Sequence, residues 1–302
     1  MVDLSIIIVS YNTPKITLEC VKSVVENVKR HSYEIIIVDN ASKDIGELRH
    51  GLEGFQQVSL IMNNNNLGFS KGNNLGIRNS EGKYILLLNS DTVVIDDSLD
   101  RLVEKCKQSN EHVVASPSLK NESGGIQLGY GPFPSITLEI IYLLKLHRLF
   151  KKWVNLSMPE DFCANQERQF NNGYLVATCM LFPRSLLTQL PGEKLFDDMF
   201  LYGEEFIWFR DFKNARATFI YDPAMSVTHY VGMSSEQGKD FYFNRKYNQM
   251  LGERTYLRKF HSKPYRYVFF IIRLLRLRLI GVIDPEMKMR YEVCMELLKS
   301  GV

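Results

Sequence analysis

The chain has 302 residues, of which 45% are hydrophobic and 24% are charged, as is usual for a globular protein. Its formal net charge of +3 is too small to favour nucleic acid as a partner, and the first half has no aromatic-basic stripe that would bind it. Five cysteines without paired metal-type spacing are typical of free thiols in a reducing compartment. The N-terminus lacks the basic region and the long apolar run of a signal peptide, so we expect a cytoplasmic protein.

Three apolar runs in the first third of the chain predict strands, at residues 5–9, 34–38 and 84–88. Each run is continuous rather than alternating in polarity, which is typical of parallel strands buried on both faces. A crossover helix between the first two strands is predicted by apolar residues at helical spacing: Ile16, Cys20, Val24 and Val28. Together these elements predict an α/β fold with one Rossmann-like, mostly parallel sheet flanked by helices.

Polar residues follow all three runs, namely Ser10-Tyr11-Asn12, Asp39-Asn40 and Asn89-Ser90-Asp91. In open α/β sheets ligands bind at the carboxyl ends of the strands, so these residues should line one edge of one sheet. The sequence therefore predicts a nucleotide site at that edge.

Asp39 stands where a dinucleotide-binding fold has the acidic residue that binds ribose hydroxyls. That reading needs a G-x-G-x-x-G turn after the first strand, and residues 10–15 do not have it. A carboxylate can also accept the imino hydrogen of a uracil or thymine ring. A turn-forming or helix-capping Asp remains an equal alternative.

The glycine- and amide-rich segment 65–76 precedes a predicted helix that runs toward Asn79. Its glycines permit close backbone approach, and the start of the helix offers N–H donors to a polar ligand. It is not a Walker loop, and a plain helix cap is the alternative.

Asp91 is the residue we predict to bind a divalent metal, because Mg²⁺ or Mn²⁺ is commonly held by one or two carboxylates and substrate phosphates. Glu204 and Glu205 begin a helix predicted to end near Asn214, where acids are stabilised by the helix dipole alone. The functional alternative makes Glu205 a general base, and then only one of the two adjacent acids should face the cleft. His229 follows a strand-like run at 218–221 and a second short run, and we expect it to have a metal or diphosphate role only if the fold brings it to Asp91.

Taken in order, these residues resemble the inverting family 2 glycosyltransferases, especially the rhamnosyltransferase-like branch that builds bacterial surface polysaccharides. The resemblance covers about residues 5–247 and rests on several separate motifs: Ser10-Tyr11-Asn12, Val38-Asp39-Asn40-Ala41-Ser42, residues 65–76, Asn89-Ser90-Asp91, Tyr202-Gly203-Glu204-Glu205 and His229. It implies the GT-A type of nucleotide-sugar transferase fold. It also implies a UDP- or dTDP-sugar donor and Mg²⁺ or Mn²⁺.

The resemblance assigns a role to each candidate site residue. Glu205 resembles the catalytic base, Asp91 resembles the carboxylate of the Asp-x-Asp metal motif, and His229 resembles a helper at the metal. The residues implied to bind the nucleotide are Ser10, Tyr11, Asn12, Asp39, Asn65, Gly68, Asn74, Asn89 and Ser90. Those implied on the acceptor side are Asn172, Gly173 and Glu204, with Asn172-Gly173 beneath a strand at 175–182.

The chain departs from the family pattern at three places. Asn89 replaces the first acid of the metal motif, so a bound metal would have one carboxylate fewer. Glu205 replaces the commoner Asp and reaches one methylene further. Ile207 and Phe209 replace more usual polar or smaller residues.

Segment 267–283 is apolar but carries three arginines, whose cost of roughly 8–10 kcal/mol at a bilayer centre outweighs the gain from its apolar residues. An arginine-free stripe at helical spacing consists of Val268, Ile272, Leu275, Leu279 and Ile283. The cations on the other side are Lys263, Arg266, Arg273 and Arg276. This pattern fits an interfacial helix under anionic lipid at 263–283, with packing on the core or on a partner subunit as the alternative.

We therefore predict one elaborated domain with a nucleotide-sugar half (1–121), an acceptor-binding and catalytic half (122–262) and an amphipathic helical extension (263–302). A glycine- and proline-rich connection at 122–134 should divide the two halves. The predicted activity is inverting, metal-dependent sugar transfer to a saccharide or lipid-linked saccharide, in the cytoplasm or at the inner face of the cell membrane. Alternatives are a catalytically silent saccharide-binding subunit and, less well supported, a nucleotidyltransferase. A homo-oligomer is left open.

Overall fold

One large mixed sheet carries most strands of the computed structural model, which describes residues 2–109, 112–146, 166–230, 239–281 and 284–299. The strands are β1 (Leu4–Ser10), β2 (Tyr33–Asp39), β3 (Val58–Met62), β4 (Tyr84–Leu88), β5 (Thr92–Val94), β6 (Val113–Lys120), β7 (Tyr130–Gly131), β8 (Arg168–Phe170), β9 (Tyr174–Leu175), β10 (Cys179–Pro183) and β11 (Thr218–His229). The helices are α1 (Pro14–Asn27), α2 (Gly46–Gly51), α3 (Phe69–Arg78), α4 (Ser98–Gln108), α5 (Ile136–Leu143), η3 (Arg184–Gln189), η4 (Pro191–Glu193), α6 (Glu204–Asn214), α7 (Lys239–Phe260), α8 (Lys263–Gly281) and α9 (Pro285–Lys299). The sheet order is β3-β2-β1-β4-β10-β6-β11-β5, with β8 paired to β11.

The first four strands of the sheet confirm the predicted parallel half. β1 pairs in parallel with β2 and with β4, and Ser10 lies opposite Asp39 at the carboxyl ends. The chain turns from β1 toward β2 and β3 on one side and toward β4 on the other, which is the switch point where open α/β sheets bind ligands. Beyond β4 the sheet becomes mixed, because β10 runs antiparallel to both β4 and β6.

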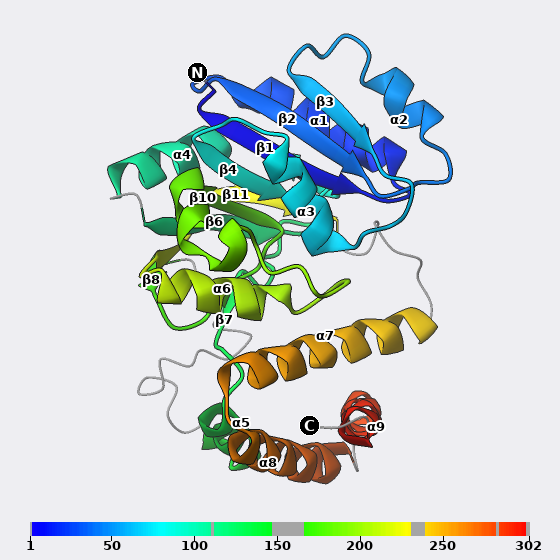
Figure 1. Cartoon of the computed structure of the whole chain (residues 1–302), viewed down its shortest axis with the longest axis vertical. Helices are drawn as coiled ribbons and strands as arrows, with labels where there is room; N and C mark the ends of the chain where they lie inside the picture. The colour runs from blue at the N-terminus through cyan, green and yellow to red at the C-terminus, as the bar shows by residue number, and fades with distance from the viewer. Residues whose placement is uncertain (1, 110–111, 147–165, 231–238, 282–283, 300–302) are drawn as a thin grey trace.

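Two hydrophobic cores lie on opposite faces of this sheet, as the continuous apolar runs predict. Ile6 and Ile8 of β1 enter one core with α1 and α4, whereas Ile7 enters the other with α3 and α6. The predicted stripe of α1 is buried, with Ile16 the most exposed of its four residues at 8%. Figure 1 shows the helices arranged on the two sides of the sheet, with α7, α8, α9 and α5 at the end remote from β3.

Several predicted boundaries need correction. The run at 175–182 is split between β9 and β10, so it is not one strand. Strand β11 runs on from the predicted Thr218–Tyr221 to His229, with a register shift between Asp222 and Ser226. The free thiols are confirmed for Cys20, Cys106, Cys179 and Cys294, and Cys163 lies outside the described residues.

Helix α8 keeps the predicted apolar stripe and its arginines on different sides: Val268, Leu275 and Leu279 are exposed, whereas Arg273 and Arg276 face the protein. Arg273 is 8% exposed and pairs with Glu139 of α5 and Glu253 of α7, and Arg276 pairs with Glu139 at 2.8 Å. The carboxylates of Glu139 and Glu253 therefore hold these two arginines within the protein, while the prediction of membrane contact through the apolar stripe is not tested. Ile283, the last residue of the predicted stripe, lies outside the described part of the chain.

Exposed apolar side chains instead gather on the outer side of α8 and on α5, which packs against it. They are Ile140, Leu144, Tyr267, Val268, Ile271, Leu275 and Leu279. None of the helices in the described ranges combines the length and apolar character that a membrane span requires.

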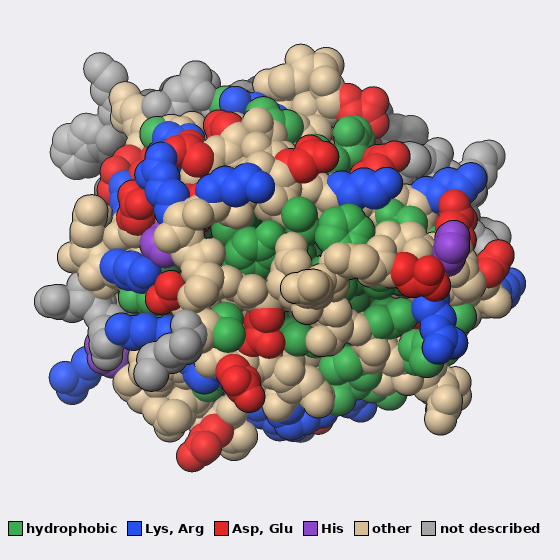
Figure 2. Space-filling model, turned by 90° about the horizontal axis from the view of Figure 1, so that it is seen from above, with side chains coloured by type: hydrophobic (Ala, Val, Ile, Leu, Met, Phe, Trp, Pro, Cys, Tyr) green, Lys and Arg blue, Asp and Glu red, His purple; other side chains and the backbone are tan. Residues whose placement is uncertain are grey.

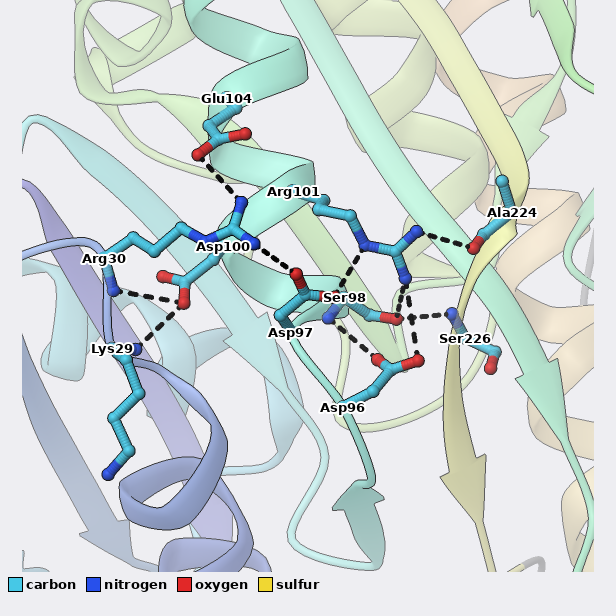
Figure 3. A network of polar contacts seen from close by, with 10 residues as sticks. All are labelled: Lys29, Arg30, Asp96, Asp97, Ser98, Asp100, Arg101, Glu104, Ala224 and Ser226. Carbon is cyan, nitrogen blue, oxygen red and sulfur yellow. Dashed lines mark hydrogen bonds and ion pairs between the residues drawn. The ribbon is translucent and has the colours of Figure 1, made fainter.

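A polar network ties α4 to the end of α1 and to the strand that carries His229 (Figure 3). The hydroxyl of Ser98 accepts the N–H of Ser226 at 2.9 Å, and Arg101 donates to the carbonyl of Ala224 at 3.1 Å. These bonds brace β11 beside its register shift, three residues before His229.

The carboxylate of Asp100 in this network accepts the backbone N–H groups of Lys29 and Arg30 at 2.9 and 3.1 Å, and the residue is 1% exposed. We expect Asp100→Ala to lower the free energy of unfolding by about 2–4 kcal/mol, because two backbone donors lose a buried, charged acceptor. Urea unfolding checks this value. Asp97→Ala is the matched control: Asp97 makes only part-exposed ion pairs in the same network and should cost less than about 1 kcal/mol. Equal losses in the two variants would contradict this account.

On the face seen in Figure 2, Lys and Arg side chains lie interspersed with Asp and Glu around a central group of hydrophobic side chains. Charges of both signs are therefore mixed on this face of the molecule.

Candidate active site

Asp91 and His229 meet at the carboxyl edge of the sheet. Asp91 lies in the turn between β4 and β5, and His229, the last residue of β11, is paired with Thr92 of β5. The backbone N–H of Tyr230 donates to the Asp91 carbonyl at 2.9 Å. As a result, His229 Nε2 lies 3.4 Å from Asp91 Oδ1. The fold therefore brings His229 to Asp91, as a role at a metal or diphosphate requires.

Gln127 orients the imidazole of His229, which sequence reasoning missed. Its Nε2 donates to the carbonyl of His229 at 2.8 Å, and its Oε1 lies 2.8 Å from His229 Nδ1. Because Oε1 can only accept, Nδ1 must carry the proton, and a neutral ring then presents the lone pair of Nε2 toward Asp91. A hydrogen bond of this kind on the far ring nitrogen is typical of histidines that bind metals.

The residues around Asp91 fit a divalent cation. A lone pair of His229 facing a carboxylate oxygen is repulsive unless the ring is protonated or a cation lies nearby. Asn89 Oδ1 is also buried and accepts no hydrogen bond from the part of the chain that the structure describes. Across the described ranges no three His, Cys, Asp or Glu side chains form a metal-binding group, so a cation here would need oxygen ligands from a bound phosphate.

One cavity of about 810 Å³ joins this corner to the start of α6. Its wall includes Asn89, Asp91 and His229 at one end and Glu204 and Glu205 further along. Both residues line the cavity, although Glu204 is 1% exposed and Glu205 is half-buried. The lining follows the N-terminus of α6 from Tyr202 to Phe206.

The two acids have unusual electrostatic surroundings. Glu204 is 1% exposed, burial raises its pKa to about 8, and the carboxylate of Glu205 adds to the shift. Burial also raises the pKa of Glu205, although the backbone around Gly203 and Ala177 donates hydrogen bonds that oppose the shift. Glu205 is the more exposed of the two. A carboxylate with a raised pKa is a stronger base near neutral pH.

The raised pKa of Glu204 predicts a pH-dependent stability. Between the ordinary carboxyl pKa and about 8 the unfolded chain loses this proton while the folded chain keeps it, so stability falls as pH rises through that window. Glu204→Gln removes this cost, and its stability advantage over the wild type should grow by about 1 kcal/mol per pH unit up to the folded pKa. Urea unfolding of both proteins across this window tests the slope. A difference that stays constant with pH would mean that Glu204 is already ionised in the folded protein.

The predicted nucleotide residues at the ends of β1 and β2 lie at the same sheet edge but do not line this cavity. Both oxygens of Asp39 accept from Ser42, through its N–H and its hydroxyl, as the alternative reading of a turn-forming Asp predicted. Asn12 has a positive φ of 57° and accepts the N–H of Lys43 at 2.9 Å. Tyr11 is 41% exposed, whereas the hydroxyl of Ser10 is buried.

In the glycine-rich segment the structure gives two residues a packing role. Asn74 is 1% exposed. Its side-chain amide donates to the carbonyl of Leu195 and to the carboxylate of Asp197, and its oxygen accepts the N–H of Leu195. This arrangement does not fit direct contact with a nucleotide. Gly68 has φ 81°, and a Cβ there would lie 2.3 Å from the carbonyl oxygen of Phe200, so its backbone approaches protein rather than ligand. Asn65 is exposed, and Ser90 is buried beside Asp91.

The predicted acceptor residues Asn172 and Gly173 do not line the cavity. Asn172 is exposed and accepts a hydrogen bond from Lys213 at 2.8 Å, and Gly173 lies against the carbonyl of Gly131. The residues that follow them do line its wall: Tyr174, Val176, Ala177 and Thr178. The predicted divider at 122–134 also contributes to the wall, through Gln127, Leu128, Gly131, Pro132 and Pro134.

The structure thus combines a Rossmann-like sheet with a carboxylate-histidine corner and two carboxylates of raised pKa at one cavity. The family model "Glycosyl transferase family 2" matches residues 5–190, more than half of the chain. The chain belongs to this family.

Curated relatives are similar over part of their length. A glycosyltransferase named GlyG from Streptococcus pneumoniae is 28% identical over 37% of this chain and 37% of its own length. The low-salt glycan biosynthesis hexosyltransferase Agl10 of Haloferax volcanii is 32% identical over 45% and 42%. A poly(ribitol-phosphate) beta-glucosyltransferase of Bacillus spizizenii is 28% identical over 58% of this chain, and the chain spans 30% of its length. The chain therefore covers less than half of each of these relatives.

Among solved structures, the crystal structure of GalNAc-T7 with UDP, GalNAc and Mn²⁺ is similar to 98% of this chain and 56% of that chain, with a TM-score of 0.63 and 14% identity. This likeness confirms the predicted fold, a mostly parallel sheet of the GT-A type followed by a helical C-terminal region.

Proposed function

We propose that this protein is an inverting glycosyltransferase that moves a hexose from a UDP- or dTDP-sugar to a hydroxyl of a saccharide or lipid-linked saccharide. The observation that carries the proposal is the single cavity that holds Asp91 and His229 together with Glu204 and Glu205. Inverting transfer needs both ends of such a cavity: a place for the departing diphosphate and a base on the opposite side of the sugar.

Glu205 is the proposed base. It takes the proton of the acceptor hydroxyl as that oxygen attacks the anomeric carbon from the face opposite the nucleotide. Its raised pKa keeps it basic near neutral pH, and it is more exposed than Glu204. Glu204, buried beside it with one oxygen that has no hydrogen-bond partner among the described residues, is proposed to hold the acceptor hydroxyl.

Asp91, His229 and Asn89 are the proposed ligands of Mg²⁺ or Mn²⁺. When bound, such a cation neutralises charge on the departing diphosphate. Asp91 supplies the single carboxylate, and Gln127 fixes the histidine ring so that Nε2 points toward that carboxylate. Asn89 contributes a neutral oxygen where the family motif has an acid, so the protein itself neutralises less of the cation's charge.

Asp39, Asn12, Tyr11 and the neighbouring Asn65 stay proposed contacts to the nucleoside, since they lie along the sheet edge that continues from Asp91. The carboxylate of Asp39 already accepts hydrogen bonds from Ser42, so a pyrimidine ring would donate its imino hydrogen to one of the remaining lone pairs. A uracil or thymine base fits such an acceptor.

We also propose that the acceptor belongs to surface-glycan synthesis and that the exposed apolar side of α8 meets the cell membrane from the cytoplasm. Relatives named for glycan biosynthesis and for poly(ribitol-phosphate) glucosylation support the first part. Exposed Val268, Leu275 and Leu279 on one side of α8 support the second, because an interfacial helix buries such a stripe among lipid headgroups.

Calorimetric titration of UDP, dTDP, GDP and CDP, with Mn²⁺ and then with EDTA, tests the proposal. Binding of UDP or dTDP that depends on Mn²⁺ is expected, and the nucleotide that binds identifies the donor series. Product analysis by NMR should then show the anomeric configuration inverted. If a saccharide binds while no nucleotide does, the alternative of a silent saccharide-binding subunit replaces this proposal.

A further inference from the structure

The wall of the active-site cavity continues past Glu205 into the C-terminal helices, which contribute five cations to it. They are Arg245 and Lys246 of α7, Arg273 and Arg276 of α8, and Arg290 of α9. Residues this basic rarely line a cavity without a negatively charged partner, because leaving water costs them hydration. Each of these cations should therefore have a carboxylate beside it or remain available to an anionic ligand.

Arg273 and Arg276 have their partners within the protein. The guanidinium of Arg273 donates to Glu139 at 2.7 and 3.0 Å and also pairs with Glu253, while Arg276 donates to the other oxygen of Glu139 at 2.8 Å. Two carboxylates thus balance two guanidinium groups. This network joins α5, α7 and α8, and its positive and negative charges balance without a ligand.

Among the described residues, the other three cations have one carboxylate partner between them, Glu286. Lys246 Nζ lies 3.5 Å and Arg290 Nη2 lies 2.8 Å from the same oxygen of Glu286. Within the part of the chain that the structure describes, Arg245 pairs with no carboxylate, and its buried Nε donates no hydrogen bond. Its guanidinium lies 5.7 Å from the centre of the Tyr202 ring. This cluster therefore carries more positive than negative charge at the cavity wall.

The three cations are close enough to affect one another. Burial lowers the pKa of Lys246, Arg290 and Arg245 lower it further, and Glu286 opposes them. A bound anion would relieve this repulsion and accept the free donors at the same time. Planar guanidinium forks beside an ammonium group suit a phosphate in particular.

The cluster also lies near the proposed base. Helix α7 packs against the start of α6 at two glycines, where a Cβ on Gly252 would come within 2.7 Å of the Cα of Gly203. Tyr202, over whose ring the Arg245 guanidinium lies, directly precedes that contact, and Glu204 and Glu205 directly follow it. An anion at the cluster would thus lie beside the start of α6, next to Glu204 and Glu205.

We propose that Arg245, Lys246 and Arg290 form a subsite for a phosphate or diphosphate group carried by the acceptor. This rests on the proposed function, in which the donor diphosphate occupies the corner of Asp91 and His229. The acceptor is then an anionic saccharide carrier. Its phosphate belongs either to a lipid diphosphate or to a phosphodiester of a polyol polymer.

Titration of inorganic pyrophosphate in EDTA into the wild type, Lys246→Gln and Arg290→Gln tests the subsite, with Arg278→Gln as the control. Arg278 is an exposed arginine of α8 that does not line the cavity. We expect the dissociation constant for pyrophosphate to be about tenfold higher in Lys246→Gln and in Arg290→Gln, because each loses one charge-assisted hydrogen bond. The control should have the same dissociation constant as the wild type. Farnesyl diphosphate in phosphatidylcholine vesicles and a glycerol phosphodiester oligomer, titrated in the same way, identify the source by which of them binds more tightly.

Equal pyrophosphate binding by all four proteins, or no binding by the wild type, overturns the subsite. So does a parallel loss of Mn²⁺-dependent UDP binding in Lys246→Gln and Arg290→Gln, because that assigns the cations to the donor diphosphate. The UDP titration also separates the two proposals. If the wild type binds no nucleotide, the proposed function fails, whereas UDP binding without the selective loss of pyrophosphate binding removes the subsite alone.

Discussion

Glu205→Gln should reduce sugar transfer by about 10²–10⁴-fold or to below detection while UDP or dTDP still binds. Gln keeps the length and polarity of the side chain but cannot accept the proton of the attacking hydroxyl. Because Glu205 is partly exposed and sits in the first turn of α6, the substitution should not disturb packing. Steady-state transfer rates, with nucleotide affinity measured on the same samples, separate the loss of chemistry from the loss of binding.

Glu204→Gln is the matched comparison, because it is the adjacent residue and undergoes the same chemical change. If Glu205 is the base, Glu204→Gln should mainly raise the KM for the acceptor. If instead Glu204→Gln abolishes transfer and Glu205→Gln retains wild-type turnover, the roles of the two residues are reversed. The raised pKa of Glu204 makes that outcome chemically reasonable, so the pair of variants is needed.

Asp91→Ala should weaken the binding of UDP or dTDP chiefly when Mn²⁺ is present, by about tenfold or more. Asp91 would supply the only carboxylate among the proposed metal ligands. In EDTA no metal is bound, so the substitution should change the nucleotide affinity little. Calorimetry of both proteins with and without Mn²⁺ gives the comparison. Equal weakening in the two conditions would point instead to disturbed folding around the β4–β5 turn.

The parallel half of the fold was predictable because its signals are local. Each strand there is a continuous apolar run followed by polar residues, and neighbouring strands bring those polar ends together without further information. The helical spacing of Ile16, Cys20, Val24 and Val28 likewise needed only the chain between two strands, and all four are buried. The register of β1 against β2 then confirmed that Ser10 and Asp39 share an edge.

The site was predictable only in part, because several contacts join segments far apart in sequence. His229 reaches Asp91 through the long strand β11, whose second half the sequence did not predict as continuous with the first. Gln127 lies in a segment expected to be an irregular connection, and nothing near it in sequence indicates its bonds to His229. Asn74 resembles a ligand residue in its motif, but a distant loop at Leu195 takes its amide.

The C-terminal helices show the same limit. The sequence separates the apolar stripe of α8 from its arginines, and that separation is found in the structure. Which side faces inward depends on Glu139 and Glu253, whose carboxylates bury Arg273 and so turn the apolar side outward. A pattern within one helix cannot reveal partners on two other helices.

The claim that Asp91 and His229 mark the donor end of one transfer cavity is tested most directly by anomalous X-ray diffraction from crystals soaked with UDP and Mn²⁺. We predict a manganese peak beside Asp91 Oδ1 and His229 Nε2, with the diphosphate next to it and the pyrimidine toward Asp39. A nucleotide bound away from the cavity that contains Glu204 and Glu205, or manganese bound elsewhere, would contradict the account.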